Sequence, residues 1–176
     1  MRIMVSTDNV AAQFAGRITA MSAEARRAFV QGLNEGGDLE RTSVRRDLKE
    51  QTGVKRYGAI LSRTGYRRAS SGNLTYTVTG TGKGMPITEF PVSASARSPV
   101  TAHPWGVAHT FKRSFKTSAK GLLRARLGSG RLPIRGLNGP AVSKEIVQGE
   151  TASHFQATAA PRVERAVMKR LGRLLP

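Results

Sequence analysis

The order of patterns along the chain predicts an α+β fold, with a small antiparallel sheet packed with an N-terminal helical region and C-terminal helices. Residues 1–65 show mainly helical spacing, residues 73–128 mainly strand-like alternation, and residues 143–175 helical spacing again. A Gly/Pro loop at 129–142 joins the last two regions. With 176 residues, of which 39% are hydrophobic, the chain has the size and composition of one domain, and we expect 1–176 to fold as a single domain.

The N-terminal region carries two helical patterns. Apolar residues recur at helical spacing in residues 9–21 and again in residues 23–34. Ser22 stands directly before the second pattern, where a serine hydroxyl can accept a hydrogen bond from the first turn of a helix. The neighbouring glycines Gly36 and Gly37 weaken this second run, because glycine is a poor helix former.

A further helical segment, residues 39–53, is charged on most of its faces. Its apolar anchors are Leu39, Val44 and Leu48. Gly53 is a suitable C-terminal stop, and a short helix is expected at about 55–63. Because it has so few apolar side chains, segment 39–53 is expected to lie on the surface or against another chain.

Strand-like alternation begins at residue 73. The segment NLTYTVT (73–79) alternates Leu74, Tyr76 and Val78 with threonines, as a half-buried strand does. Three later segments are also strand-like, namely MPITEFPVSASAR (85–97), GVAHTFKRSF (106–115) and GLLRARLGSG (121–130). Prolines at positions 86, 91, 99 and 104 are expected to keep these strands short or at a sheet edge.

The C-terminal region consists of a loop and a helix. The loop GRLPIRGLNGPAVSKEI (130–146) mixes glycines and prolines with apolar residues, and Ser143 is a candidate N-cap for the turn that follows. Residues 151–175 are expected to be helical, with Pro161 starting or kinking the helix. The apolar stripe of this helix comprises Val163, Val167, Leu171 and Leu174 or Leu175.

Charge is the most extreme property of the sequence. The formal net charge is +18 at pH 7, and residues 51–144 hold sixteen Lys or Arg against one acid, Glu89. Because such a charge repels itself in an isolated compact state, we expect a polyanion or a neutralising assembly nearby. Aromatic residues are few, so sequence-specific recognition of single strands is not expected.

Two sets of basic residues are candidates for facing DNA or another polyanion. The first choice lies on and just after segment 39–53 and comprises Arg41, Arg45, Arg46, Lys49, Lys55 and Arg56. The second choice lies in the strand region and comprises Lys112, Arg113, Lys116, Lys120, Arg124 and Arg126. Either set can contact the phosphates of duplex DNA without reading sequence, or pack against an acidic protein, and both alternatives stay open.

Several classes of function lack the residues that they require. The absence of cysteine removes disulfides, thiol catalysis and most structural zinc sites. The three histidines (103, 109 and 154) lack metal-ligand spacing, and the acids do not form the cluster that metal-assisted hydrolysis needs. We expect no catalytic, cofactor or metal site. No apolar run is long enough to cross a membrane and the N-terminus lacks a signal-peptide pattern, so we expect synthesis in the cytoplasm.

Four segments resemble, in order, the phage minor tail protein Z family, also called tail completion proteins. They are TSVRRDLKEQTGVK (42–55), RRASSGNLTYTVTGTGKGMPITEF (67–90), TAHPWGV (101–107) and GRLPIRGLNGPAVSKEI (130–146). The resemblance implies a small antiparallel sheet packed with helices and a non-enzymatic virion protein at the head-proximal end of a tail. It further implies a homo-oligomeric ring, commonly sixfold, around the DNA channel, with tail-tube or terminator and head-connector proteins as partners.

The Gly/Pro loop and a nearby tryptophan are the candidates for the subunit contact. The residues are Trp105, Leu132, Pro133, Ile134, Leu137, Gly139 and Pro140. A loop stiffened by prolines loses little entropy on binding, which suits a docking surface. Folding of the loop onto the core of its own chain is an equal alternative. For the whole protein, the alternative function is a small non-specific nucleic-acid-binding protein.

Overall fold

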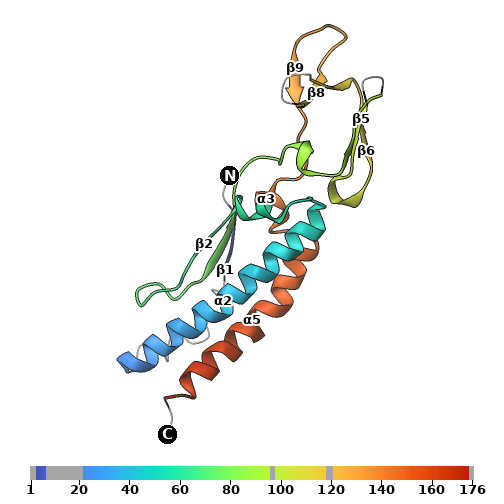
Figure 1. Cartoon of the computed structure of the whole chain (residues 1–176). Coiled ribbons are helices and arrows are strands. Elements are labelled where there is room, and N and C mark those ends of the chain that lie inside the picture. The colour runs from blue at the N-terminus through green and yellow to red at the C-terminus, as the bar shows by residue number, and fades with distance from the viewer. Residues whose placement is uncertain (1–2, 7–21, 96–97, 118–120, 175–176) are drawn as a thin grey trace.

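Two long helices lying side by side occupy one end of the molecule, and a β-rich lobe occupies the other (Figure 1). The computed structural model describes residues 3–6, 22–95, 98–117 and 121–174. Helices α2 (Ala23–Thr52) and α5 (Gly149–Leu171) lie side by side, and a three-stranded sheet packs beside α2. The predicted α+β class is confirmed. The helix predicted at 9–21 lies outside the described residues.

The described strands form three short antiparallel sheets rather than the one sheet expected. The first has the order β1–β3–β2, with β1 at Ile3–Ser6, β3 at Thr77–Gly80 and β2 at Thr64–Arg67. The second has the order β4–β5–β6, at Val92–Ser93, Val100–Ala102 and His109–Phe111. The third has the order β7–β8–β9, at Ser114–Lys116, Leu123–Arg126 and Ile134–Gly136. The last two sheets make up the lobe, residues 92–136.

Short helices connect these parts, and some differ from expectation. The helix predicted at about 55–63 is α3 (Tyr57–Leu61), and α4 (Val142–Glu145) precedes α5. Within the predicted strand 85–97, Ile87–Glu89 is a 3-10 turn, η1, and a second such turn, η2, spans Pro104–Gly106. Pro86 precedes the first turn and Pro104 begins the second, which is why these segments make only short strands.

Helix α2 is one continuous helix, and its two ends lie where the sequence predicts. The Ser22 hydroxyl accepts a 3.2 Å hydrogen bond from the Ala25 amide, and Gly53 ends the helix in the left-handed conformation with φ of 71°. Gly36 and Gly37, which were expected to weaken the helical run, lie inside this helix. Both glycines are buried, and other parts of the chain pack closely against them.

The start of α5 is held by a residue distant in sequence. The Gln51 side chain accepts a 2.8 Å hydrogen bond from the Thr151 amide and donates one of 2.8 Å to the carboxylate of buried Glu145. Ser143 is not the N-cap of α4, because it lies inside this short helix and its hydroxyl donates to the Gly82 carbonyl. Helix α5 does not begin at Pro161, since this proline lies inside the helix.

Two apolar clusters form the core of the described chain. The larger one joins the second half of α2, the first sheet and the base of the lobe, and includes Val44, Leu48 and Phe90. The smaller one lies between the helices, where Phe29 and Val163 pack with Val167. The expected stripe of α5 is therefore partly confirmed. No described helix has the length and apolarity needed to cross a membrane.

Candidate polyanion-binding and subunit-contact surfaces

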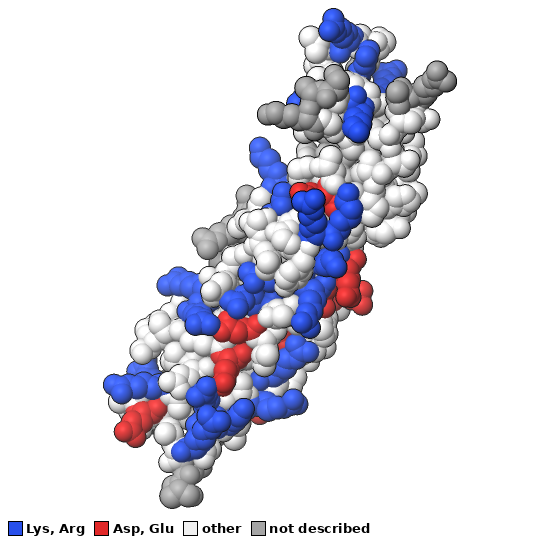
Figure 2. Space-filling view, in the orientation of Figure 1, with Lys and Arg blue, Asp and Glu red and all other residues white. Residues whose placement is uncertain are grey.

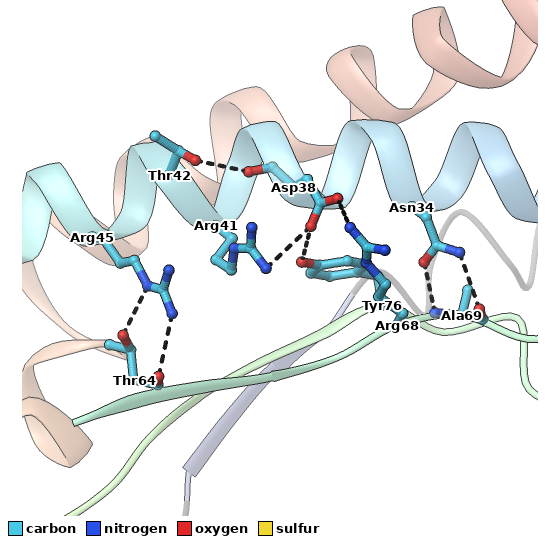
Figure 3. Close-up of polar contacts among 9 residues, drawn as sticks. All are labelled: Asn34, Asp38, Arg41, Thr42, Arg45, Thr64, Arg68, Ala69 and Tyr76. Atoms are coloured by element: carbon cyan, nitrogen blue, oxygen red, sulfur yellow. Dashed lines mark hydrogen bonds and ion pairs between the residues drawn. The ribbon is translucent and has the colours of Figure 1, made fainter. Parts of the chain in front are cut away.

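One polar stripe of α2 faces strand β2 and the segment that follows it (Figure 3). Asn34, Asp38, Arg41 and Arg45 occupy this stripe, because steps of three and four residues keep side chains on one helix face. Asn34 donates to the carbonyl of Ala69 at 3.1 Å and accepts from its amide at 2.9 Å. The stripe therefore supplies hydrogen bonds that a neighbouring strand would otherwise supply.

The Arg45 guanidinium closes the other end of this stripe. Its Nε donates to the Thr64 hydroxyl at 2.8 Å, and a terminal nitrogen donates to the Thr64 carbonyl at 3.3 Å. Arg41 stacks over the Tyr66 ring, with its guanidinium carbon 4.0 Å from the ring centroid, and pairs with Asp38 at 3.2 Å. Both arginines therefore hold the sheet to the helix.

Asp38 is the centre of the stripe. Its carboxylate accepts a 2.7 Å hydrogen bond from the Tyr76 hydroxyl and forms an ion pair with Arg68. Burial, followed by the bond to the Asp38 carboxylate, raises the pKa of Tyr76 above its ordinary value. The same carboxylate raises the pKa of Arg68. This carboxylate is thus fully engaged within the chain.

The structure divides the first predicted basic set. Arg46, Lys49, Lys55 and Arg56 are exposed. Arg41 and Arg45 are not available as a free polyanion-facing pair, because the helical period turns them toward β2. These two residues contact their own sheet and helix, and the exposed members of the set are the other four.

The lobe contains the clearest concentration of unbalanced charge. No acid occurs in the sequence between Glu89 and Glu145. The described cations of the lobe are Lys112, Arg113, Lys116, Arg124, Arg126, Arg131 and Arg135, and none of them makes an ion pair. In Figure 2 the visible lobe at the top carries Lys and Arg, whereas the visible Asp and Glu lie below it. The second-choice set therefore lies where the field is least compensated; Lys120 is outside the described residues.

Strand alternation gives the lobe a basic outer face. Along β8, Leu123 and Ala125 are buried, whereas Arg124 is half-buried and Arg126 is exposed. The Arg126 guanidinium carbon lies 5.3 Å from the centroid of the Phe115 ring on the paired strand. An arginine held over an aromatic ring keeps its charge while losing side-chain freedom.

The predicted contact loop is partly exposed and partly core. Leu132 is 71% exposed and Pro133 is also exposed, so both remain available for a contact. Leu137 is only 5% exposed and Pro140 is buried, while Gly139 lies so close to the Phe90 ring that a Cβ would be 2.7 Å from it. At these three residues the loop folds back onto the core of its own chain, which is the alternative that the sequence left open. Ile134 is half-buried in β9.

Trp105 lies at the junction of helix and lobe in a strained backbone conformation. Its φ is 54° and it is 44% exposed, with its ring edge-on to His109 at 6.0 Å between centroids. The turn is held because it abuts the end of α2, where a Cβ on Gly53 would lie 3.0 Å from the Gly106 amide nitrogen. Other exposed large apolar residues of the lobe are Val107, Leu122 and Leu127.

Possible metal ligands do not gather in the part of the chain that the structure describes. Among the described residues, no three His, Cys, Asp or Glu side chains come together as metal ligands. His154 pairs with Asp47 at 2.6 Å, which joins α5 to α2.

No family model, curated protein or solved structure matches the chain.

Proposed function

We propose that this chain is a non-enzymatic virion protein that completes the head-proximal end of a phage tail. It forms a ring with copies of itself, with sixfold symmetry as the first expectation, around the channel that carries DNA. It contacts tail-tube or terminator and head-connector proteins. The order of the four family-like segments supports the class. The observation that carries the proposal is the lobe, which combines unpaired cations with no acid.

The lobe suits a channel wall because its charge attracts phosphate without selecting a base sequence. Its exposed apolar side chains suit contacts between subunits. Leu132 and Pro133 lie in the loop between β8 and β9 and Trp105 lies in the turn η2, so one subunit can present different surfaces to its two neighbours. Such head-to-tail contacts close into a ring when the rotation between subunits divides a full turn.

The test is the mass of the purified chain, alone and with a phage tail-tube protein, by native mass spectrometry. We expect an oligomer, formed alone or on the tube. Leu132→Asp should shift the chain toward monomer while leaving it folded, because this side chain is 71% exposed. Leu137→Asp should instead misfold it, because a charge would be buried. A strict monomer that ignores both tube and head-connector proteins overturns the proposal.

A small nucleic-acid-binding protein is the second candidate, and the unpaired lobe cations favour it too. It predicts binding of free duplex DNA in moderate salt, with affinity falling steeply as salt rises. A tail protein whose cations meet an acidic neighbour predicts weak binding that physiological salt abolishes. Titration of one labelled duplex at several salt concentrations separates these outcomes.

A further inference from the structure

An open groove of about 530 Å³ runs between α2 and α5, away from the lobe. From α2 it is lined by Glu35, Asp38, Leu39, Arg41 and Thr42. From α5 it is lined by Arg162, Arg165, Ala166 and Lys169. On each helix the lining positions follow steps of three and four residues, so one stripe of each helix forms one wall.

Both acids of the groove are already neutralised. Glu35 accepts two hydrogen bonds from Arg170, at 2.8 and 2.9 Å, and this contact lowers the pKa of the Glu35 carboxyl. Asp38 is engaged by Arg41, Arg68 and Tyr76. The acids therefore leave no free negative charge in the groove.

Two cations of the groove remain unpaired. Arg162 pairs with buried Glu40 at 3.0 Å. Arg165 and Lys169, one turn apart on α5, are exposed and make no ion pair with the described residues. The groove therefore presents an unbalanced positive rim along α5.

The floor of the groove is apolar. Leu39 is 60% exposed although it lies mid-helix, and Ala166 adds a small side chain opposite it. The alkyl stems of Arg165 and Lys169 extend this apolar area, because long cationic side chains cover surface while their charges stay in water. Leu39 is therefore an exposed apolar side chain of α2 that lies in a groove with paired acids and unpaired cations.

We infer that this groove docks an amphipathic helix of another protein, with apolar residues toward Leu39 and acidic residues toward Arg165 and Lys169. Two adjacent helices form a groove into which the side-chain ridge of a third helix packs. Charge complementarity makes the incoming helix acidic. Docking here is independent of the ring, since the groove includes neither the lobe nor the contact loop.

A second copy of this chain is a poor occupant. On α2, the exposed acids without an ion pair are Glu24 and Glu50, which lie at opposite ends of the helix. On α5 the corresponding acids are Glu150 and Glu164, which are also far apart. Neither described long helix therefore offers an acidic ridge that could face Arg165 and Lys169.

The test uses the full chain and a fluorescent synthetic helix of about five turns, roughly 18 residues, with a leucine stripe flanked by glutamates. One control peptide has lysine in place of each glutamate, and another has the same composition in scrambled order. Binding is followed by fluorescence anisotropy at about 0.1 M salt, where surface charges still interact.

The protein variants separate the rim from the floor. R165E/K169E should weaken binding by about tenfold or more, because attraction becomes like-charge repulsion. Leu39→Asp should weaken it comparably without unfolding the chain, since Leu39 is exposed. K83E/K144E, which makes the same change of net charge at two exposed residues outside the groove, should alter binding less than about twofold.

Three outcomes overturn the inference. The scrambled peptide can bind as well as the ordered one, which indicates general charge attraction. R165E/K169E can match K83E/K144E, which places the binding elsewhere. R165E/K169E can instead weaken binding of duplex DNA and leave the peptide unaffected, which makes the groove a phosphate-binding surface.

Discussion

Among single residues, two glycines set how closely the long helices approach each other. A Cβ on Gly32 would lie 2.5 Å from the Cα of Val167, and one on Gly36 would lie 2.7 Å from the Cα of Val163. These neighbours are backbone atoms, which cannot rotate away as a flexible side chain can. The absence of side chains at both positions therefore permits the observed distance between α2 and α5.

Gly36→Ala should destabilise the protein by about 1–3 kcal/mol, although alanine is the better helix former, because overpacking exceeds the gain in propensity. The matched control is Gly58→Ala in α3, where a Cβ has no neighbour within 4 Å. That variant should be neutral or more stable by up to about 1 kcal/mol. Chemical denaturation measures both, and equal effects of the two substitutions would contradict close packing at Gly36.

Glu40 is a buried acid at the same helix interface. It is 1% exposed, pairs with Arg162 at 3.0 Å and accepts a 3.2 Å hydrogen bond from the Thr158 hydroxyl. Burial raises the pKa of its carboxyl above the ordinary 4.5, in spite of the opposing effect of Arg162. The folded chain therefore holds this proton more tightly than the unfolded chain does.

The stability of the wild type relative to Glu40→Gln should fall as pH rises from about 4.5 through the raised pKa of Glu40. Stability falls because the Glu40 carboxyl of the unfolded chain loses its proton at a lower pH than that of the folded chain. Over this pH range, ionisation therefore favours the unfolded chain. Urea denaturation of both proteins between about pH 4 and pH 7 measures the difference. Parallel pH profiles would show that burial does not control this carboxyl.

Among the helices and strands, α2 is the partner of a strand edge as well as of α5. Strand β2 is an edge of the β1–β3–β2 sheet, and unpaired edges invite association with other chains. Asn34 and Arg45 bond backbone groups of Ala69 and Thr64, near the two ends of this edge. The polar stripe of α2 therefore covers an edge that would otherwise be open to another strand.

Asn34→Ala should cost about 1–3 kcal/mol, because the amide and carbonyl of buried Ala69 lose their partner. Hydrogen exchange at the Ala69 amide should accelerate in this variant more than exchange in α5. Thr42→Ala is the control, since the exposed Thr42 hydroxyl bonds only the Asp38 carbonyl of its own helix. Unchanged exchange at Ala69 would mean that the asparagine does not protect the edge.

Over the whole molecule, charge is separated along the long axis. The ion pairs of the described chain lie on the two long helices and the sheet beside them, where Asp38 and Glu40 each pair with arginine. The lobe has cations alone. On the face visible in Figure 2, the long helices carry both basic and acidic residues, whereas the charged residues of the lobe are basic.

Two matched double variants test which basic set contributes to the proposed binding of DNA. Arg124→Ala with Arg126→Ala should lower the salt slope of duplex DNA binding by about one for each phosphate that the protein no longer neutralises. Arg46→Ala with Lys49→Ala removes the same charge from exposed positions of α2 and should change the slope little. Binding at several salt concentrations gives both slopes, and a larger change in the α2 variant reverses the assignment.

The predictable parts of the fold are those that depend on neighbours in the sequence. Ser22 and Gly53 mark the ends of α2 because capping involves only the adjacent turn. The helical and strand-like regions follow from local periodicity. Strands β1, β2 and β9 lie outside the region predicted to form strands, because short segments such as Thr64–Arg67 and Ile134–Gly136 carry too little alternation to stand out.

The candidate surfaces were predictable in charge but not in availability. The same residue type serves two purposes on α2, where Arg45 bonds strand β2 and Arg46 is exposed. The spacing of Asn34, Asp38, Arg41 and Arg45 was the available signal, since it marks one polar stripe. Which surface faced that stripe depended on residues 64–76, far along the chain.

Local patterns were enough to predict the α+β class, the ends of α2 and the excess of positive charge between Glu89 and Glu145, because periodicity, capping and net charge are local or additive. Three other features required the folded chain: Gly36 is a packing point, Leu137 belongs to the core while Leu132 is exposed, and Arg41 is engaged. Each of these depends on side chains brought together from distant parts of the chain, and no local pattern specifies them.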